Sequence, residues 1–232
     1  MLKTTRTLEI LDPLPIQLNP AEISKQLRMS HTGQKERIQK FVAKYQNIID
    51  AKAVYKVSYV DDRRERAVRI DGVTFSSGIL RKNLDQVQRV FPFIVTIGEG
   101  LQEKVDQSEN LMDKYVLDVI GNIALGEARR SLKERLKQRF ALKGLSFMSP
   151  GSLADWPIEE QVPLFSLFED QGGLPISVRL NPSLMMIPVK SISGIYFPTE
   201  IPFYSCQLCP RDRCPGRKAA YDRQIARAYM ED

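Results

Sequence analysis

The sequence predicts an α+β fold in which a mixed, mainly antiparallel sheet is flanked by helices. Some short segments alternate apolar and polar side chains, as strands with one buried face do, whereas others repeat apolar residues at helical spacing. These segments do not follow a regular strand–helix–strand order, which argues against a doubly wound parallel sheet. With 232 residues, of which 43% are apolar, the chain can bury a substantial core.

The strands are predicted from alternation and from the turn residues that bound it. Residues 53–60 and 66–70 alternate on either side of a charged turn, which predicts a hairpin. Residues 90–97 form another apolar run, and Pro92 within it predicts an edge position or a bulge, because proline lacks the N–H that a ladder requires. Further strands are expected at 176–180 and 191–197, and residues 1–19 are expected to be irregular or to form an edge strand.

The helices are predicted from apolar spacing and from their caps. Asn19 and Pro20 suit the cap and the first position of a short helix. A long helix begins near Asn110, buries one face and ends near Gly144. The remaining helices are expected at 32–49, at 79–87, after Gly98, at 157–168 and at 218–230, and residues 145–157 are expected to form a loop. This order suggests three segments, at 1–110, 111–204 and 205–232.

Charge and composition exclude several classes of protein. The chain has 34 Lys and Arg against 28 Asp and Glu, and its basic segments are mixed with acids, so we expect no nucleic-acid binding. No run of about 18 apolar residues exists, so we expect no membrane span. No secretory signal core is evident, and the three cysteines are too few for a disulfide framework, so we expect a cytoplasmic protein. Walker, dinucleotide and serine-protease motifs are missing, and we assign no catalytic residues.

The three cysteines are the first candidate for chemistry. Cys206, Cys209 and Cys214 lie within nine residues, and clustered thiolates are ligands for an iron–sulfur cluster or for zinc. A fourth ligand would have to come from His31, Asp212, water or another molecule. The alternative is a reduced trio that holds no metal.

Glu127 and a glycine loop are the other candidates. Glu127 continues the apolar face of the long helix, where a carboxylate needs a ligand or an internal ion pair. Ser149, Pro150, Gly151 and Ser152 form a turn that could bring backbone amides to a ligand or could be a plain connection. The sequence alone leaves both alternatives open for each feature.

An ordered set of motifs resembles the activation domain of cobalamin-dependent methionine synthase, in the free-standing bacterial form with a cysteine-rich tail. The set comprises Gly126-Glu127-Ala128, Ser149-Pro150-Gly151 with Asp155-Trp156-Pro157, Glu160 to Phe165, Leu180 to Pro188, and Lys190 to Ile195 followed by Tyr204. The resemblance implies the fold of that domain.

The resemblance also implies an S-adenosylmethionine site. Glu127 and Tyr204 match the helix Glu and the later Tyr of that site in the family. Phe147 stands where the family has an Arg, and Ser152 stands where it has a Tyr. Because Phe cannot pair with the carboxylate of adenosylmethionine, the resemblance implies the fold more strongly than it implies this ligand.

The function implied is an accessory one, because the chain has no cobalamin, folate or homocysteine module of its own. We expect it to support reductive reactivation of a cobalamin or corrinoid methyltransferase, with the cysteines relaying an electron. One alternative is the adenosylmethionine-binding module of a split methionine synthase. Another is a non-catalytic interaction module clipped by zinc. The expected partner is a corrinoid-binding protein or a methionine synthase core, which supplies the cobalamin.

Overall fold

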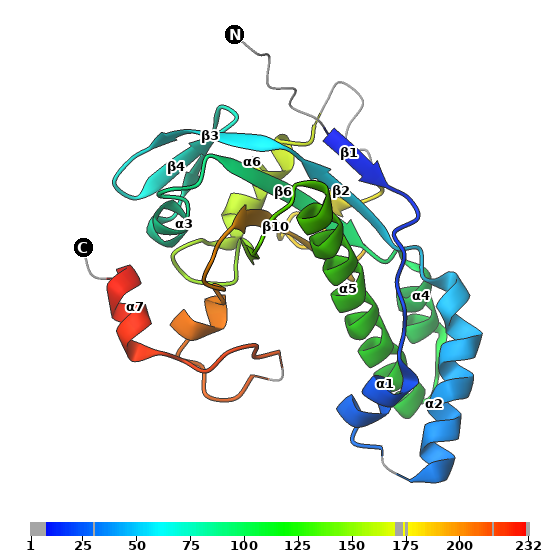
Figure 1. The fold of residues 1–232 in the computed structure, drawn as a ribbon. Coiled ribbons are helices and arrows are strands. Elements are labelled where there is room, and N and C mark those ends of the chain that lie inside the picture. Colours follow the sequence, from blue (N-terminus) through cyan, green and yellow to red (C-terminus); the bar gives the residue numbers. More distant parts are fainter. Residues whose placement is uncertain (1–7, 30, 170–173, 175, 215, 231–232) are drawn as a thin grey trace.

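A single antiparallel sheet organises the molecule, as the sequence predicts. The computed structural model describes residues 8–29, 31–169, 174, 176–214 and 216–230. In Figure 1 the sheet forms the top of an arch, a helical leg descends on one side, and the C-terminal segment descends on the other. Within the described residues, no helix is both long enough and apolar enough to cross a bilayer.

The strands and helices have the following bounds. The strands are β1 (Leu8–Leu11), β2 (Lys52–Lys56), β3 (Ser58–Arg63), β4 (Ala67–Ile70), β5 (Val73–Ser76), β6 (Arg89–Thr96), β7 (Leu145–Met148), β8 (Arg179–Leu180), β9 (Met186–Ile187) and β10 (Ser191–Pro198). The α-helices are α1 (Pro20–Gln26), α2 (Thr32–Tyr45), α3 (Gly78–Asn83), α4 (Gly100–Gln107), α5 (Leu111–Arg139), α6 (Gln161–Ser166) and α7 (Arg223–Met230). Short 3₁₀ turns are η1 (Gln46–Ile48), η2 (Ile158–Glu160) and η3 (Ser205–Leu208).

Strand β6 lies inside the eight-stranded sheet. It pairs with β10 along one side and with β2 and β3, end to end, along the other. The sheet continues from β2 to β1, from β3 through β4 to β5, and from β10 to β7, which is an edge strand. Strands from both sides of residue 110 therefore share one sheet. Strands β8 and β9 form a separate two-stranded sheet.

The prediction that Pro92 marks an edge or a bulge is wrong. Pro92 pairs with Ile195 of β10, and β6 has neighbours on both sides. The reason is visible in the register on the other side, where Phe93 pairs with Tyr55 and Val90 pairs with Ser58. Pro92 thus stands opposite the break between β2 and β3, where no continuous ladder needs its missing N–H.

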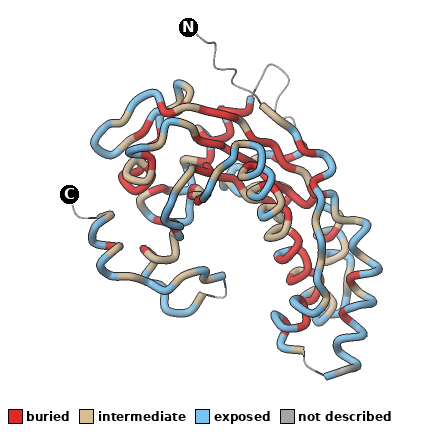
Figure 2. Tube along the Cα trace, viewed as in Figure 1, coloured by how far each residue is buried: buried red, intermediate tan, exposed pale blue. Residues whose placement is uncertain are grey.

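The sheet has a hydrophobic core on each face. Phe91, Phe93 and Val95 point into the first core, which α1, α2, α4 and α5 cover, and Val90 and Ile94 point into the second core. The second core is completed by α3, α6, α7 and the fully buried Trp156. Figure 2 shows buried residues along the sheet and along the inner side of α5.

Helix α5 starts as the sequence predicts but ends earlier. The Asn110 side chain accepts the backbone N–H of Met112 at 2.8 Å, a standard N-cap bond. Val116, Ile120 and Ile123 are buried together, which confirms the predicted face. The helix stops at Arg139, and Ala141 takes the left-handed conformation (φ +50°), so Gly144 is not the stop. A side chain at Gly144 would instead collide with the carbonyl of Thr199 beside β7.

Several other boundaries differ from the predictions. The segment 53–60 is two strands, β2 and β3, and β4 pairs with a further strand, β5, that the sequence analysis did not identify. The predicted loop 145–157 begins with β7, and the predicted strand 176–180 shortens to β8. Helix α7 begins at Arg223 rather than near Lys218, because the Asp222 side chain accepts the N–H groups of Gln224 and Ile225. Residues 1–7 of the predicted opening segment lie outside the described residues.

Candidate functional site

Glu127 is held by a neighbour on its own helix. Its Oε1 atom lies 2.7 Å from Nη1 of Arg130, one turn further along α5. The Glu127 side chain is 17% exposed and the Arg130 side chain 62%, so the pair reaches solvent through the arginine. The structure thus provides the internal ion pair that a carboxylate at this position requires. A ligand that approaches this part of α5 meets a carboxylate that is already oriented.

The 149–152 turn is closed by its own hydrogen bonds. The N–H of Ser152 donates to the carbonyl of Ser149 (3.2 Å), and Gly151 has a φ of +78°, as in a type II turn with proline at its second position. The N–H of Gly151 donates to the carbonyl of Trp156 at 2.8 Å. Both amides are therefore used within the protein, and a ligand here would meet side chains rather than free backbone donors.

The motif that follows the turn is structural. Asp155 accepts hydrogen bonds from the Ser77 hydroxyl (2.5 Å) and from the N–H of Ile79 (2.9 Å), which ties the turn to the start of α3. Arg66 adds an ion pair at 2.7 Å. This motif therefore anchors the 149–152 turn to α3. The carboxylate of Asp155 is occupied by these contacts and, being an acceptor, cannot donate a hydrogen bond to a ligand.

The residue before Tyr204 is hydrogen-bonded to β7, the strand that leads into the 149–152 turn. The N–H of the preceding residue, Phe203, donates to the hydroxyl of Ser146 on β7 at 2.8 Å. Phe203 packs in the second core, whereas the side chain of Phe147 on β7 packs against the first, so the two rings lie on opposite faces of the sheet. Tyr204 itself is 44% exposed. The structure thus brings Tyr204 and the 149–152 turn to the same edge strand.

An arginine that the sequence analysis missed lies over Phe147, on the first-core face of β7. The guanidinium carbon of Arg129 lies 4.6 Å from the centre of the Phe147 ring, a cation–π contact. Its Nη1 atom lies 3.5 Å from the Tyr196 hydroxyl, which in turn donates to the Arg129 carbonyl at 3.1 Å. Arg129 forms no ion pair with a carboxylate among the described residues. It occurs in a run of charged residues, so no local signal distinguished it from its solvated neighbours.

Burial of the Tyr196 phenol reinforces this arrangement. Removal from water raises the pKa of Tyr196 to about 12, while the nearby Arg129 charge acts in the opposite direction. The ring also stacks on Phe93, with centroids 4.3 Å apart. Tyr196 therefore remains a neutral hydrogen-bonding group that holds the Arg129 backbone in place.

The cysteine loop is organised by an arginine. The Arg217 guanidinium donates to the carbonyls of Cys206 (3.0 Å), Cys209 (3.2 Å) and Ala219 (3.2 Å), and also to that of Arg211. The Cys206 sulfur accepts the N–H of Lys218 at 3.4 Å.

This geometry does not fit the predicted metal centre. Across the described part of the chain, no three His, Cys, Asp or Glu side chains form a group that could hold a metal ion. Cys206, Cys209 and Cys214 form no disulfide. The guanidinium of Arg217 binds the backbone carbonyls of the loop that carries them. We therefore derive no electron transfer step through this loop.

Two cavities of the molecule lie away from the predicted site. The larger, about 580 Å³, is lined by residues of α1, α2 and the turn between them. The other, about 470 Å³, includes Glu99, Glu169 and Arg179. Neither is lined by Glu127, the 149–152 turn or Tyr204.

Comparison with known proteins supports the fold that the motifs imply. No family model matches the sequence, and no curated protein matches it. Among solved structures, the chain is similar to one described as the "MetH Reactivation Domain bound to AdoHcy". The TM-score is 0.58 at 14% identity, over 87% of this chain and 81% of that one. The protein therefore has the α+β fold of the MetH reactivation domain.

Proposed function

We propose that this protein is an activation-domain-like accessory factor that supports reductive reactivation of a cobalamin or corrinoid methyltransferase. The observation that carries the proposal is the fold similarity to the MetH reactivation domain over 87% of the chain. The partner, a corrinoid-binding protein or a methionine synthase core, would supply the cobalamin and its cobalt chemistry. This chain would dock on that partner and support the reduction of its cobalt.

A complementation assay tests this role. A cobalamin-dependent methionine synthase without its own activation domain is inactivated by oxidation. It is then mixed with this protein, adenosylmethionine and titanium(III) citrate as reductant. Recovery of methionine synthesis that depends on this protein supports the proposal. Recovery at the same rate with reductant alone contradicts it.

A second function, as the adenosylmethionine-binding module of a split methionine synthase, is favoured by the position of Arg129. Phe147 on β7 occupies the position at which the family has an arginine. In this protein the guanidinium of Arg129 lies over the Phe147 ring. A guanidinium has five N–H donors. Among the described residues, Arg129 has one side-chain hydrogen bond, to the Tyr196 hydroxyl, so most of its donors remain for a ligand carboxylate. Glu127 lies two residues away on the same helix, so it points in another direction, and it is held by Arg130.

The two functions are compatible, and ligand binding separates them. An accessory factor that works only by docking needs no affinity for adenosylmethionine, whereas the second function requires it. Calorimetric titration of the purified protein with S-adenosylhomocysteine and S-adenosylmethionine distinguishes the two. The predicted zinc clip and iron–sulfur relay gain no support from the cysteine loop, where Arg217 is the organising group.

A further inference from the structure

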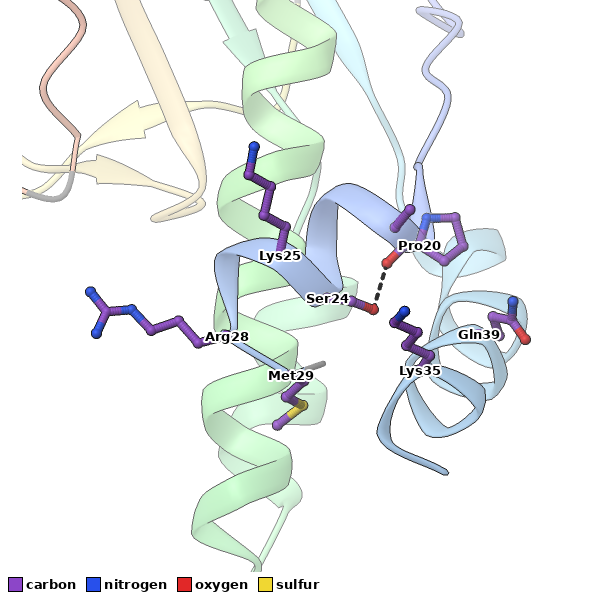
Figure 3. Close-up of a pocket in the computed structure, with 8 residues that line it drawn as sticks. Pro20, Ser24, Lys25, Arg28, Met29, Lys35 and Gln39 are labelled. Atoms are coloured by element: carbon purple, nitrogen blue, oxygen red, sulfur yellow. Dashed lines mark hydrogen bonds between the residues drawn. The ribbon is translucent and has the colours of Figure 1, made fainter. Parts of the chain in front are cut away.

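The larger cavity lies between the first two helices, and no residue of β7 is among the described residues that line it. It has a volume of about 580 Å³ and is lined by Lys25 and Arg28 on one side and Lys35 on the other. Pro20 and Met29 contribute apolar surface. Figure 3 shows the Ser24 hydroxyl turned back to the Pro20 carbonyl, to which it donates at 2.8 Å. The polar groups that face outward here are therefore mainly cationic.

These three cations have no carboxylate partner among the described residues. A neighbouring arginine shows the contrast, because Arg37 on α2 pairs with Asp113 at 2.5 Å. Residues 19–45 contain six Lys and Arg against two Glu, so this hairpin of helices carries a clear excess of positive charge. Unpaired like charges around one hollow raise the local concentration of anions.

The directions of the side chains indicate an extended anion. In Figure 3, Lys25 points along α5, Arg28 points away from α2, and Lys35 rises from α2 on the opposite side. They do not converge on one atom, as ligands of a single phosphate would. They instead suit several negative charges distributed over a surface.

Apolar side chains lie at the same end of the molecule. The Arg37–Asp113 pair places the first turn of α5 beside α2. The side chains of Leu111 and Met112 in that turn are exposed, Leu111 by 81%. Exposed large apolar side chains beside cations are typical of a protein-binding surface. None of the described residues that line the cavity has an aromatic ring to stack a nucleobase, which argues against a single-stranded nucleic acid.

We propose that this surface, defined by Lys25, Arg28, Lys35, Met29 and Leu111, docks an acidic amphipathic segment of a partner protein. Carboxylates of the segment pair with the three cations, and one of its apolar side chains enters the hollow against Met29. The surface shares no residue with the Glu127 and β7 region, so docking here and ligand binding there can be tested separately.

The test uses the full chain and two labelled synthetic peptides. One is an amphipathic peptide of Glu and Leu, and the other has every Glu replaced by Gln. Fluorescence anisotropy measures their binding at low and at physiological salt. The variant Lys25→Gln/Arg28→Gln/Lys35→Gln is compared with Lys143→Gln/Lys218→Gln/Arg223→Gln, which removes the same charge from exposed positions elsewhere. Circular dichroism checks that both variants fold.

We expect the Glu peptide to bind more tightly than the Gln peptide and to weaken with salt. The first variant should bind it about 10-fold more weakly, as expected for three partly exposed ion pairs, and the control should change little. Methyl NMR should show shifts at Met29 and Met112.

Equal loss in both variants would overturn the proposal, because it would show attraction by net charge alone. So would equal binding of the two peptides. Shifts at Met29 with phosphatidylserine vesicles or an oligonucleotide, but not with the Glu peptide, would also overturn it, since another class of partner would then be the occupant.

Discussion

Arg129 on α5 stacks over the ring of Phe147 on β7, with 4.6 Å between the guanidinium carbon and the ring centre. The contact joins the helix that carries Glu127 to the strand that leads into the 149–152 turn. The contact also places a positive charge beside Phe147, which occupies the position of the family's arginine. Substituting Arg129 therefore separates the two functions proposed above.

Arg129→Gln should weaken binding of S-adenosylhomocysteine by roughly 10-fold or more, because a charge-assisted bond to the ligand carboxylate contributes about 1.5–3 kcal/mol. Arg130→Gln is the matched control, since Arg130 is more exposed and already pairs with Glu127. Isothermal titration calorimetry measures both variants. Equal effects of the two substitutions, or no binding by the unmodified protein, would contradict a ligand role for Arg129.

The protein should lose stability in strong alkali through Tyr196. Burial raises the pKa of Tyr196 to about 12, whereas an unfolded tyrosine titrates near 10. The native state therefore keeps its proton longer, so this stabilisation is complete below about pH 10 and is lost as the pH rises towards 12. Urea unfolding at about pH 9 and about pH 11 should show a smaller loss for Tyr196→Phe than for the unmodified protein. An identical loss would show that Tyr196 does not contribute.

Gly151→Ala should destabilise the protein by about 1–2 kcal/mol, because Gly151 has a left-handed φ of +78°. A Cβ atom there would also lie only 3.0 Å from Cδ1 of Ile158. Ser152→Ala, which removes one hydroxyl bond from the exposed end of the same turn, is the control and should cost less. Thermal unfolding measures both. A larger effect at Ser152 would show that the turn is not limited by backbone conformation.

Asp155→Ala should be more damaging, at roughly 2–3 kcal/mol, because it leaves the Ser77 hydroxyl and the Ile79 N–H without their acceptor. Asp62→Ala removes a surface carboxylate that pairs with Arg64 and should cost much less, because solvent screens an exposed ion pair. Chemical denaturation compares the two variants. Comparable losses would mean that Asp155 does not anchor the turn to α3.

Protein purified without oxygen should contain less than one equivalent of iron or zinc, because the cysteine loop is arranged around Arg217. Elemental analysis and visible absorbance measure this directly. Arg217→Ala should loosen the loop and increase the reactivity of its thiols towards a maleimide reagent. A coloured protein with stoichiometric iron would restore the predicted electron relay.

Local patterns determined much of the architecture. The apolar run at 90–97 predicts a strand, and the structure places the two faces of that strand in two cores. The spacing of Val116, Ile120 and Ile123 predicts the buried face of α5. The cap at Asn110 marks where that helix begins. These features are predictable because helix and strand periods are set by backbone geometry within a few residues.

Only the tertiary structure decided where these elements meet. Pro92 lies in an interior strand because β2 and β3 break opposite it, and no local pattern contains that fact. Arg129 reaches Phe147, and Arg217 gathers the cysteine loop, through contacts that depend on long-range packing. The sequence by itself thus determined which faces are buried and which motifs are present. The charged side chains that lie beside these faces and motifs depend on how distant segments pack, because the whole fold sets the partners of a side chain.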